Sequence, residues 1–590
     1  MNKYCSLPHW QFKSSAACLN QEELAIIATK LQVSPFLVQL MTLRGIDTVE
    51  NMDRYLKPSL RYLLPLDQWP HIEDGARYIL QSIEQGEKIA LWGDYDVDGI
   101  TAVALIKDFF SQRNIHIEHH IPDRLESGYG LDIQKIHSLA DQDIKLLLTV
   151  DCGIANIREI QEAKSLGMKV VLTDHHLPGP KLPEADIIIN PKLQGWPCSH
   201  LAGVGVAFLL MGALNRMLPG NPLDIRQYLD LVALGTIADV VPLDEQNRIL
   251  VKNGLTVLSE AHRPGIQALK KISGFAPGET VGSNAIGFSL APRINAAGRI
   301  GDPNLAVDLL LEKNSSKAMS IAHQLDQLNT DRKAEENRIV GEALLQVQTQ
   351  LHLPGFVLHS EHWHPGIIGI VASRIVEKYH RPCIMLTKEK GLFKGSGRAT
   401  AACDLYQALV TCQEHLYTFG GHKQAAGLKL EPFQLARFKK SFSQAIQKQL
   451  GDLLRKPVVE VDLELPFSKI SSSLVEELRL LQPYGPGNPR PIFLSPPVWV
   501  KKYRFFSHNQ HLELYLSDLK NGSHMRAVAW RQGEQWKNIP LQDQVIIITY
   551  FPKISKYQGL HQLELTIRDI FMQDQPGVMH PTSIAKEKNQ

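Results

Sequence analysis

The chain has 590 residues, which is too long for one hydrophobic core and predicts three or four domains. Apolar residues make up 44% of it and charged residues 21%, which excludes a disordered or fibrous protein. The 63 basic and 61 acidic residues leave a net charge of +2. Because the total charge gives no attraction to polyanions, any nucleic-acid binding must come from local basic patches.

The cysteines and the N-terminal sequence indicate a cellular compartment. The 7 cysteines form no CxxC pair and no framework spacing, which predicts a reducing compartment and no structural zinc. The N-terminus lacks the apolar core of a signal peptide, and the longest apolar stretch, at 204–214, is too short to span a bilayer. We therefore expect a cytoplasmic protein with no membrane segment.

The first part of the chain predicts a parallel α/β sheet. We divide it into an N-terminal segment, 1–50, and a first domain, 51–304. From about residue 85 to 200, short β-branched or leucine-rich runs alternate with amphipathic helical runs. This pattern is typical of βαβ units, whose parallel sheet is covered by helices on both faces and carries its chemistry at the carboxyl ends of the strands. Residues 200–310 are predicted to be mainly helical.

The next segment, 305–350, has apolar residues among many charges, and its central part, 325–340, contains neither glycine nor proline. We predict a long helix that connects two lobes, rising about 1.5 Å per residue. Two shorter helices of one bundle are the alternative.

Two further domains complete the predicted fold. Residues 351–453 have a second α/β pattern with glycine-rich turns. Residues 454–575 contain short alternating strands separated by polar turns, which predicts an all-β domain of the five-stranded OB type. Residues 576–590 are polar, and we predict a disordered tail. The expected fold class is α/β, with two lobes joined by a long helix and a C-terminal OB-fold domain.

The first predicted strand ends in an acidic motif. The sequence GDYDVDG places Asp94, Asp96 and Asp98 at alternate positions before a helix. In an extended segment residues two apart point the same way, so these carboxylates would repel one another unless cations bind them. A solvated acidic turn or a helix cap is the alternative. A calcium loop is less suitable because its downstream Glu is missing.

Acids and histidines also end later strands. VDCG carries Asp151, and TDHHLP carries an acid followed by His175 and His176. Parallel order brings these strand ends to one rim. Asp239, in the apolar stretch GTIADVVPL, would need a partner or a metal if buried, although a helix cap would also explain it. Oxygen ligands with one or two imidazoles suit Mn²⁺ or Mg²⁺, and two such ions would activate a water and neutralise a phosphoryl oxygen.

These four motifs, in this order, resemble the metal motifs of the DHH phosphoesterase superfamily. LAPRINAAGRIGD, HWHPGIIGIVASR, FKGSGR and FGGHKQAAG resemble motifs of its RecJ branch and of the DHHA1 domain, and LQPYGPGNPRPIF resembles the start of the RecJ OB segment. The resemblance covers roughly 45–570. It implies a metal-dependent 5′-to-3′ exonuclease that degrades single-stranded DNA to mononucleotides in recombination and repair.

The resemblance also implies two metal ions and their ligands. One ion would be held by Asp98, Asp151, His175 and Asp239, with Asp151 bridging to a second ion. The second would be held by Asp96 and Asp94, but many superfamily members have a histidine where this chain has Trp92. His176 would lie nearer the substrate than the metal, and a packed structural role is its alternative, as bracing the turn is for Asp94. The implied catalytic residues are Asp96, Asp98, Asp151, His175 and His176.

Substrate contacts are expected from glycine turns and arginines. GSGR and GGH are short glycine turns whose N–H groups can face a phosphate. Side-chain donors beside them are Ser396, Arg398 and His422. By resemblance, Arg124 and Arg299 would hold the 5′-terminal phosphate, and Arg293 is a further candidate; each could instead form an ordinary surface salt bridge.

The β-rich end carries interleaved basic and aromatic residues in KKYRFF and MRAVAWR, the composition of a stacking platform for single strands. The stacking candidates are Tyr503, Phe505, Phe506 and Trp530. In a barrel half of such residues face inward, so interior packing is the alternative. A second adjacent pair, His119 and His120, lies in a predicted strand without a neighbouring acid, and we expect at least one of them to pack.

Three functions remain open at this point. The main prediction is the exonuclease, acting as a monomer on single-stranded DNA, with a helicase and a single-strand-binding protein as partners by family analogy. A DHH-type phosphatase or phosphodiesterase acting on small nucleotides is the second, but the extra β domain argues against it. A catalytically inactive DNA-binding scaffold is the third, and the intact acids argue against it.

Overall fold

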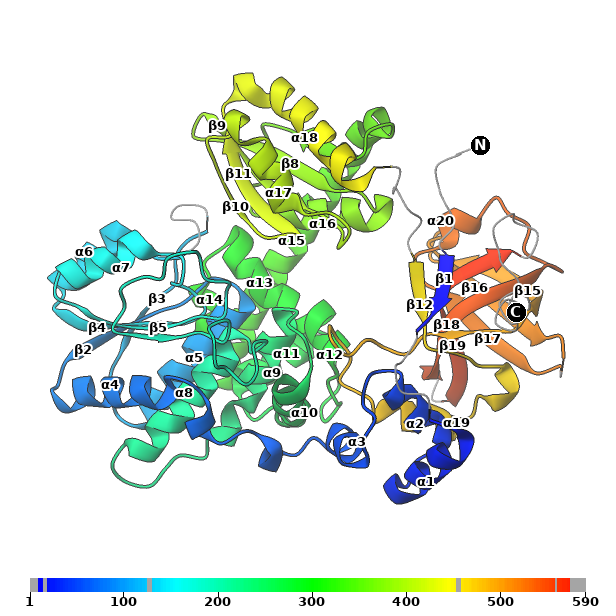
Figure 1. The fold of residues 1–590 in the computed structure, drawn as a ribbon, viewed down its shortest axis with the longest axis horizontal. Helices are drawn as coiled ribbons and strands as arrows, with labels where there is room; N and C mark the ends of the chain where they lie inside the picture. The colour runs from blue at the N-terminus through cyan, green and yellow to red at the C-terminus, as the bar shows by residue number, and fades with distance from the viewer. Residues whose placement is uncertain are drawn as a thin grey trace. The chain divides into compact units, whose positions relative to one another are not determined.

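The structure is a computed structural model that describes residues 9–13, 19–124, 130–451, 458–520, 522–557 and 560–572. Figure 1 shows the course of the chain. The chain divides into two compact units. One, here the α/β unit, comprises Ser59–Leu454 and Gly485–Asn488. The other, here the β-rich unit, comprises Met1–Pro58, Arg455–Tyr484 and Pro489–Gln590.

The first lobe of the α/β unit contains a parallel sheet with the strand order β3–β2–β4–β5–β6. Its strands are β2 (Lys88–Trp92), β3 (Glu118–His120), β4 (Ile144–Thr149), β5 (Lys169–Thr173) and β6 (Ile187–Ile189). The helices around it are α4 (Ile72–Glu84), α5 (Val97–Gln112), α6 (Ile133–Asp141), α7 (Ile157–Ser165) and α8 (Gly203–Met217). Helices α6 and α7 cover one face, while α4 and α8 cover the other (Figure 1). The predicted doubly covered parallel sheet is confirmed.

Helices follow the sheet, as predicted. They are α9 (Leu229–Ala238), α10 (Glu245–Glu260), α11 (Pro264–Ile272), α12 (Ser283–Ala285), α13 (Ala291–Ile300) and α14 (Asn304–Leu311), with a π-helix at Ile286–Leu290. Helix α9 is apolar all round and almost wholly buried, because it packs against α5, α8 and α10. Its last turn therefore brings the next residue, Asp239, to the edge of the lobe's core.

One helix connects the two lobes of this unit. Helix α15 (Ser315–Gln350) is 36 residues long, and it begins where the Asn314 side chain accepts hydrogen bonds from the backbone N–H groups of Ser316 and Lys317. It packs first against α11 and α13 and later against α16 (Ile368–Tyr379) of the second lobe. The chain therefore forms one long connecting helix here rather than two shorter ones.

The second lobe contains a mixed sheet with the order β10–β11–β9–β8–β7. Its elements are β7 (Phe356–His359), β8 (Cys383–Glu389), β9 (Leu392–Arg398), β10 (Thr418–Gly421), β11 (Ala425–Leu430), α17 (Leu405–Thr411) and α18 (Leu435–Leu450). The prediction of a turn at GSGR is wrong, because this motif lies within β9. A Cβ at Gly395 would lie 2.6 Å from the Leu386 side chain, and one at Gly397 2.8 Å from the Leu405 side chain, so these glycines make room for apolar neighbours.

The β-rich unit is built around a closed barrel. Its strands are β15 (Val498–Phe506), β16 (His511–Asp518), β17 (His524–Ala529), β18 (Val545–Tyr557) and β19 (Leu560–Met572). They pair in the order β18–β15–β16–β17–β19, and β19 pairs back with β18, so the barrel closes (Figure 1). Before and beside it lie β12 (Val458–Val461), β13 (Leu463–Glu464), α19 (Ser472–Arg479), β14 (Phe493–Leu494) and α20 (Gly533–Trp536). The predicted OB-type domain is confirmed.

The N-terminal residues belong to the β-rich unit. Their elements are β1 (His9–Phe12), α1 (Gln21–Leu31), α2 (Pro35–Thr42) and α3 (Val49–Leu56). Strand β1 pairs in parallel with β12, and the Phe36 ring of α2 lies 5.6 Å from the ring of Phe493, which is part of the barrel core. The predicted tail, 576–590, lies outside the described residues.

Among the described residues, no single helix is both long and apolar enough to cross a membrane, and the sharply bent pair Gln21–Leu31 with Pro35–Thr42 passes that test by length and composition only.

Candidate metal centre

Three neighbouring strands of the parallel sheet end at one rim. Strand β2 leads to Asp94, β4 leads to Asp151, and β5 leads to His175. All three side chains are buried. The structure therefore brings together acids and an imidazole that come from separate βαβ units, as the alternation of strands and helices predicts.

The acidic motif after β2 does not have the predicted extended geometry. Strand β2 ends at Trp92, and Asp96 caps the N-terminus of α5 by accepting hydrogen bonds from the N–H groups of Asp98 (2.9 Å) and Gly99 (3.2 Å). Asp98 therefore lies in the first helical turn. The extended prediction is wrong because an aspartate at this position starts a helix more readily than it continues a strand. Asp96 is therefore a helix cap, which was the alternative, and it also lies in an acidic cluster with Asp94 and Asp151.

Asp98 is fixed by the start of α8. Its carboxylate oxygens accept hydrogen bonds from the N–H groups of Gly203 (2.6 Å) and Val204 (2.9 Å). A Cβ at Gly203 would lie 2.7 Å from the Cβ of Asp151, and a Cβ at Gly235 in α9 would lie 2.9 Å from an Asp98 oxygen. These glycines let two helices approach the carboxylates, and sequence reasoning missed them because glycine inside a helix gives no local signal of close packing.

His175 lies at the centre of the site. Its Nε2 atom is 3.0 Å from Asp151 Oδ1, 3.5 Å from Asp239 Oδ2 and 3.7 Å from Asp98 Oδ2. Asp239 is the C-cap residue of α9, so its helix-end alternative also holds. Burial and then the charge of His176 lower the pKa of His175 to about 3, which keeps the ring neutral. A neutral imidazole facing carboxylates is available as a metal ligand.

Asp174 is a second residue that the site prediction missed. Its carboxylate is fully buried and accepts hydrogen bonds from the N–H groups of Ile154 (2.9 Å), His175 (2.7 Å) and His176 (3.0 Å). It also lies 2.8 Å from His176 Nδ1. Asp174 therefore orients both histidines, and the signal for this role was its place directly before them in TDHHLP.

The donor atoms of these residues group in a way that suits two cations. Among the described residues, the groups close enough to share an ion are Asp94–Asp96–Asp151, Asp98–His175–Asp239 and Asp151–His175–His176. Asp151 belongs to two of them. Buried Asp94 Oδ1 has no hydrogen-bond partner among the described residues, as expected for an atom that faces a cation position. Carboxylates with one or two imidazoles match the preferences of Mn²⁺ and Mg²⁺.

The electrostatics of the acids supports the same fit. Burial, and then the neighbouring Asp98, raise the pKa of Asp239 to about 9, while burial and Asp96 raise that of Asp98 to about 7. Burial and other carboxylates also hold the pKa values of Asp94 and Asp151 well above the ordinary range. Such a cluster cannot ionise fully by itself, and divalent cations would supply the missing positive charge.

His176 differs from its neighbour in exposure and charge. Its side chain is 37% exposed. Burial opposes its charged form, but the hydrogen bond and the charge of Asp174 raise its pKa to about 9, so the ring is an imidazolium at neutral pH. Burial, and then the charge of His176, lower the pKa of His422, which follows β10 in the second lobe. His176 is therefore close enough to the GGH segment for its charge to act on His422.

Arginines from both lobes gather near the acids. The Arg124 guanidinium lies 5.0 Å from the centre of the Tyr95 ring. Tyr95 is the residue between Asp94 and Asp96. Arg299 donates from Nη1 to the Gly366 carbonyl oxygen (3.2 Å). Burial, and then the charges of Arg124 and Arg332, lower the pKa of Arg299 to about 10. Mutually repelling cations beside a metal site are an arrangement that an anion would stabilise.

Two other candidate substrate residues lie on β9. Arg398 donates from Nη1 to Ser396 Oγ (3.1 Å) and to the Gly397 carbonyl oxygen (2.8 Å), and burial and then Arg124 lower its pKa. Arg293 differs, because it pairs with Asp326 of α15 (2.8 Å). Its salt-bridge alternative therefore holds. Arg332 of α15 was not predicted, because nothing in the local sequence shows that it lies near Arg299.

The aromatic candidates in the β-rich unit divide between two faces. Tyr503 and Phe505 pair in register with Leu514 and Leu512, and both pack against the barrel core. Phe506 and Trp530 instead form an edge-to-face pair at 5.7 Å, and Trp530 is 45% exposed. The interior alternative therefore holds for the first pair, while the second pair lies on the outer face.

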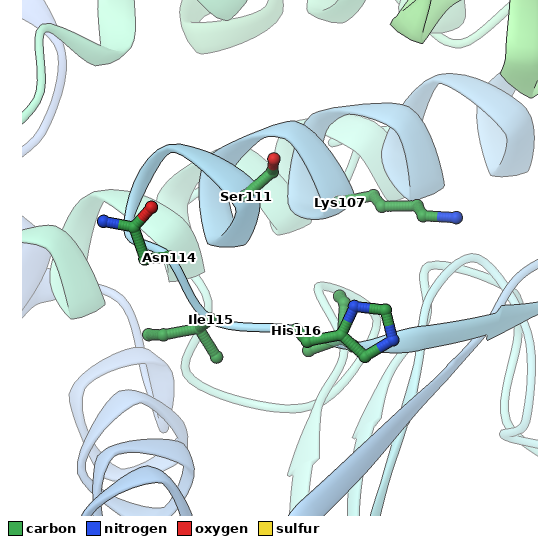
Figure 2. A pocket seen from close by; sticks show the side chains of 6 residues that line it. Lys107, Ser111, Asn114, Ile115 and His116 are labelled. Atoms are coloured by element: carbon green, nitrogen blue, oxygen red, sulfur yellow. The ribbon is translucent and has the colours of Figure 1, made fainter.

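The adjacent histidines of β3 are packed. The ring of His120 lies 4.3 Å from that of Trp92, and His119 Nδ1 lies 2.6 Å from Lys107 Nζ. A cavity of about 330 Å³ nearby is lined by residues that include Lys107 and Ser111 from α5 and His116 from the loop before β3 (Figure 2). It lies at the C-terminal part of α5, whereas Asp98 lies in the first turn of that helix, so it is separate from the metal centre.

The fold and this centre define a DHH-type phosphoesterase. Residues 88–236 match the DHH family, N-terminal domain; residues 352–448 match the DHHA1 domain; and residues 461–569 match the RecJ OB domain. The chain is 34% identical to single-stranded-DNA-specific exonuclease RecJ of Bacillus subtilis, over 93% of this chain and 70% of that protein. It is also 34% identical to the RecJ of Salmonella typhimurium, over 91% and 96% of the two chains. The chain belongs to the RecJ family.

Solved structures agree with this assignment. A crystal structure of RecJ in complex with Mn²⁺ from Thermus thermophilus matches with a TM-score of 0.82 and 29% identity, over 97% of this chain and 80% of that chain. A crystal structure of exonuclease RecJ bound to manganese matches with a TM-score of 0.58 and 34% identity, over 65% and 96%. The predicted resemblance and the predicted fold class are both confirmed.

Proposed function

We propose that this chain is a metal-dependent exonuclease that degrades single-stranded DNA from the 5′ end to mononucleotides, in DNA recombination and repair. The observation that carries this proposal is the buried centre in which His175 Nε2 faces the carboxylates of Asp98, Asp151 and Asp239 within 3.7 Å. The names of the relatives, single-stranded-DNA-specific exonucleases, support the substrate. The 5′ polarity and the biological role rest on the family resemblance.

The proposed ligand sets follow the groups of donor atoms. Asp98, His175 and Asp239, with Asp151 beside His175, would hold one divalent cation, and Asp94, Asp96 and Asp151 would hold a second, so Asp151 would serve both. Mn²⁺ or Mg²⁺ bound there would lower the pKa of a water to supply the nucleophile and would neutralise charge on the scissile phosphate. We propose Mn²⁺ or Mg²⁺ because the metal-bound RecJ structures contain one or the other.

The chain's own side chains position the substrate. Asp174 holds His176 as an imidazolium, which can donate to a phosphate oxygen. Arg124 and Arg299 supply charge for a terminal phosphate, with the Arg124 guanidinium carbon 5.0 Å from the centre of the Tyr95 ring. On the second lobe the proposed backbone contacts are Ser396, Arg398 and His422.

The alternatives fit less well. An enzyme for small nucleotides would make no use of the outward Phe506 and Trp530 of the β-rich unit, and a scaffold would not need the repelling carboxylates of the centre. We further propose, from the family resemblance, that the protein acts as a monomer in the cytoplasm, with a helicase and a single-strand-binding protein as partners.

The deciding experiment compares substrates. Single strands labelled at the 5′ end, duplexes and dinucleotides are incubated with Mn²⁺ or with a chelator. We expect release of labelled mononucleotide from single strands with Mn²⁺ alone. Hydrolysis of dinucleotides but not of long strands would overturn the proposal in favour of the small-nucleotide enzyme, and no metal-dependent hydrolysis of any substrate would favour the scaffold.

The proposed bridging residue has its own test. Asp151→Ala should abolish cleavage and retain DNA binding, because the carboxylate is buried at the centre and belongs to a different unit from the proposed stacking aromatics. Asp141→Ala, an exposed acid at the end of α6, is the control and should behave as wild type. Wild-type turnover in Asp151→Ala would remove the proposed metal bridge.

A further inference from the structure

A short glycine turn belongs to the α/β unit although its sequence neighbours do not. Gly485–Asn488 groups with the α/β unit, while Arg455–Tyr484 before it and the chain from Pro489 onward group with the β-rich unit. The turn is closed by reciprocal backbone hydrogen bonds between Gly485 and Asn488, of 3.0 and 3.1 Å. Asn488 is 2% exposed. A hydrogen-bonded turn that is anchored in the α/β unit by buried Asn488 has a structural purpose within that unit.

The turn binds the loop that follows Asp239. The backbone N–H of Leu243 donates to the Pro486 carbonyl oxygen at 2.7 Å. A Cβ at Gly487 would lie 3.1 Å from the Pro242 Cβ and 3.4 Å from the Leu243 backbone nitrogen. Gly487 also has φ of +71°, a conformation that favours glycine. Gly487 is therefore fitted against the rigid Pro242 and the backbone of Leu243, neither of which can move away as the end of a flexible side chain could.

The loop itself needs such support. Val240, the residue after Asp239, has φ of +62° and is 63% exposed. A β-branched residue in this conformation is strained, and strain of this kind persists only where surrounding contacts fix the backbone. Val240 has few contacts of its own, so the restraint must act from the residues beyond it. The hydrogen bond at Leu243 is such a restraint.

A second restraint lies on the other side of the same loop. Asn247 of α10 is fully buried, and its amide donates to the carbonyl oxygens of Pro242 (2.9 Å) and His200 (2.5 Å). Residue 200 leads directly into the start of α8, whose first N–H groups bind Asp98. Asn247 therefore links the loop that follows Asp239 to the segment that leads into α8 and Asp98. The GPGN turn adds a further hydrogen bond to the same loop, at Leu243.

We propose that the GPGN turn, Gly485–Asn488, is a positioning element of the metal centre, which sets the Asp239 carboxylate by fixing the strained loop behind it. This inference rests on the proposed function, since it assumes that Asp239 binds a cation. No residue of the turn belongs to the groups of donor atoms in the centre, so the turn acts through the backbone of Pro242 and Leu243. Its effect is on cation affinity, and removal of a supporting contact of this kind typically lowers metal affinity about 10- to 100-fold.

The test measures binding of Mn²⁺ alone to the full chain, by titration calorimetry and by the electron paramagnetic resonance signal of free Mn²⁺. Gly487→Ala should raise the Kd for Mn²⁺ by roughly tenfold or more. The matched control is Gly278→Ala, in the same unit. Gly278 has φ of +75°, close to that of Gly487, but nothing lies within 4 Å of its added Cβ, so its Mn²⁺ affinity should remain wild type.

Asp239→Asn identifies the route of the effect. If the turn acts through Asp239, adding Gly487→Ala to Asp239→Asn should raise the Kd little further, because coupled residues give non-additive effects. Single-stranded DNA binding without metal should be unchanged in Gly487→Ala. Wild-type Mn²⁺ affinity in Gly487→Ala, an equal loss in Gly278→Ala, or full additivity with Asp239→Asn would each overturn the proposal.

A milder variant decides the question if Gly487→Ala does not fold. A Cβ at Gly485 would meet only the end of the Leu243 side chain, at 2.8 Å, and Gly485 has no positive φ. Gly485→Ala should raise the Kd in the same direction by a smaller factor, and unchanged affinity would overturn the inference. A wild-type chain that binds no Mn²⁺ would instead remove the proposed metal centre itself, so the two failures are distinguishable.

Discussion

At the scale of single residues, the metal centre depends on a glycine that leaves space for the carboxylates. Gly203 begins α8, donates its N–H to Asp98 and leaves the space that the Asp151 side chain fills. A side chain at Gly203 would displace either Asp151, which fills this space, or the backbone that binds Asp98, and both aspartates are proposed metal ligands. Glycine is therefore part of the centre even though it contributes no ligand atom.

Gly203→Ala tests this point. The new Cβ would lie 2.7 to 2.9 Å from three Asp151 side-chain atoms, so the carboxylate must shift, and we expect cleavage to fall by about a hundredfold. Gly205→Ala in the same helix is the control, because its Cβ would meet only the Leu201 side chain at 3.5 Å. The rate of mononucleotide release checks both variants. Equal losses in both would mean that α8 tolerates no alanine and that Asp151 is not the cause.

His119 gives a pH-dependent prediction away from the centre. Burial, and then the charge of Lys107, lower its pKa from 6.5 to about 4. The folded state therefore binds fewer protons than the unfolded state between these values, so the stability from neutral His119 is present above pH 6.5 and is lost as the pH falls towards 4. We expect the free energy of unfolding of His119→Gln to fall less than that of wild type between pH 7 and pH 5. Urea unfolding at both pH values checks this, and equal slopes would contradict it.

At the scale of elements, the long helix α15 is bound to the second lobe by a buried acid. Glu336 is 1% exposed and pairs with Arg332 of the same helix (2.7 Å) and with Arg374 of α16 (2.6 Å). Arg332 in turn lies close enough to Arg299 to lower its pKa. One carboxylate therefore supports both the joint between the lobes and the arginines beside the metal centre.

Glu336→Gln should weaken this joint. The substitution leaves buried Arg332 without its countercharge, and because Arg374 is half exposed we expect a loss of about 2 to 3 kcal/mol in the free energy of unfolding. Glu335→Gln, one residue earlier and paired with exposed Arg338, is the control and should change stability by less than about 1 kcal/mol. Denaturant unfolding of both variants measures the difference, and equal stability would contradict the role of Glu336.

The elements also show why some structure was predictable from sequence and some was not. The strands of the parallel sheet are buried on both faces, so their near-continuous apolar runs were enough to identify them. GSGR was misassigned to a turn because the two glycines there relieve contacts with Leu386 and Leu405, which are set by the neighbouring strand and helix. The extended geometry expected for Asp94, Asp96 and Asp98 was wrong because it depends on where β2 stops, and Asp96 took the helix-cap alternative.

The candidate site divides in the same way. The convergence of Asp98, Asp151 and His175 follows from parallel strand order, which the sequence pattern contains. The roles of Gly203 and of the GPGN turn depend on contacts between segments far apart in sequence, and no local pattern reports them. Local sequence therefore predicts many of the acids of the site, whereas the residues that position those acids are known only from the tertiary structure.

At the scale of the whole molecule, we expect long single-stranded DNA to bind the outer face of the barrel. Trp530 and Phe506 lie outward, and the Lys553 ammonium lies 5.5 Å from the centre of the Trp530 ring. Trp530→Ala should weaken binding of a long single strand by about 1 to 3 kcal/mol, the usual value of one base-stacking side chain. Phe433→Ala, another exposed aromatic but in the α/β unit, should bind as wild type. Fluorescence anisotropy at fixed salt checks both, and unchanged affinity in Trp530→Ala would exclude this face.

The pairing of β1 with β12 has a consequence for synthesis of the protein. Lys13 and Asp462 form an ion pair across 449 residues of sequence, so β1 leaves the ribosome long before its partner strand β12 exists. At about 5 to 20 residues per second, the α/β unit has time to bury its own core during that wait. The segments of the β-rich unit lie before and after the α/β unit in sequence, so the β-rich unit closes only after the α/β unit has been synthesised, and chains terminated before β12 would expose the apolar residues of α2.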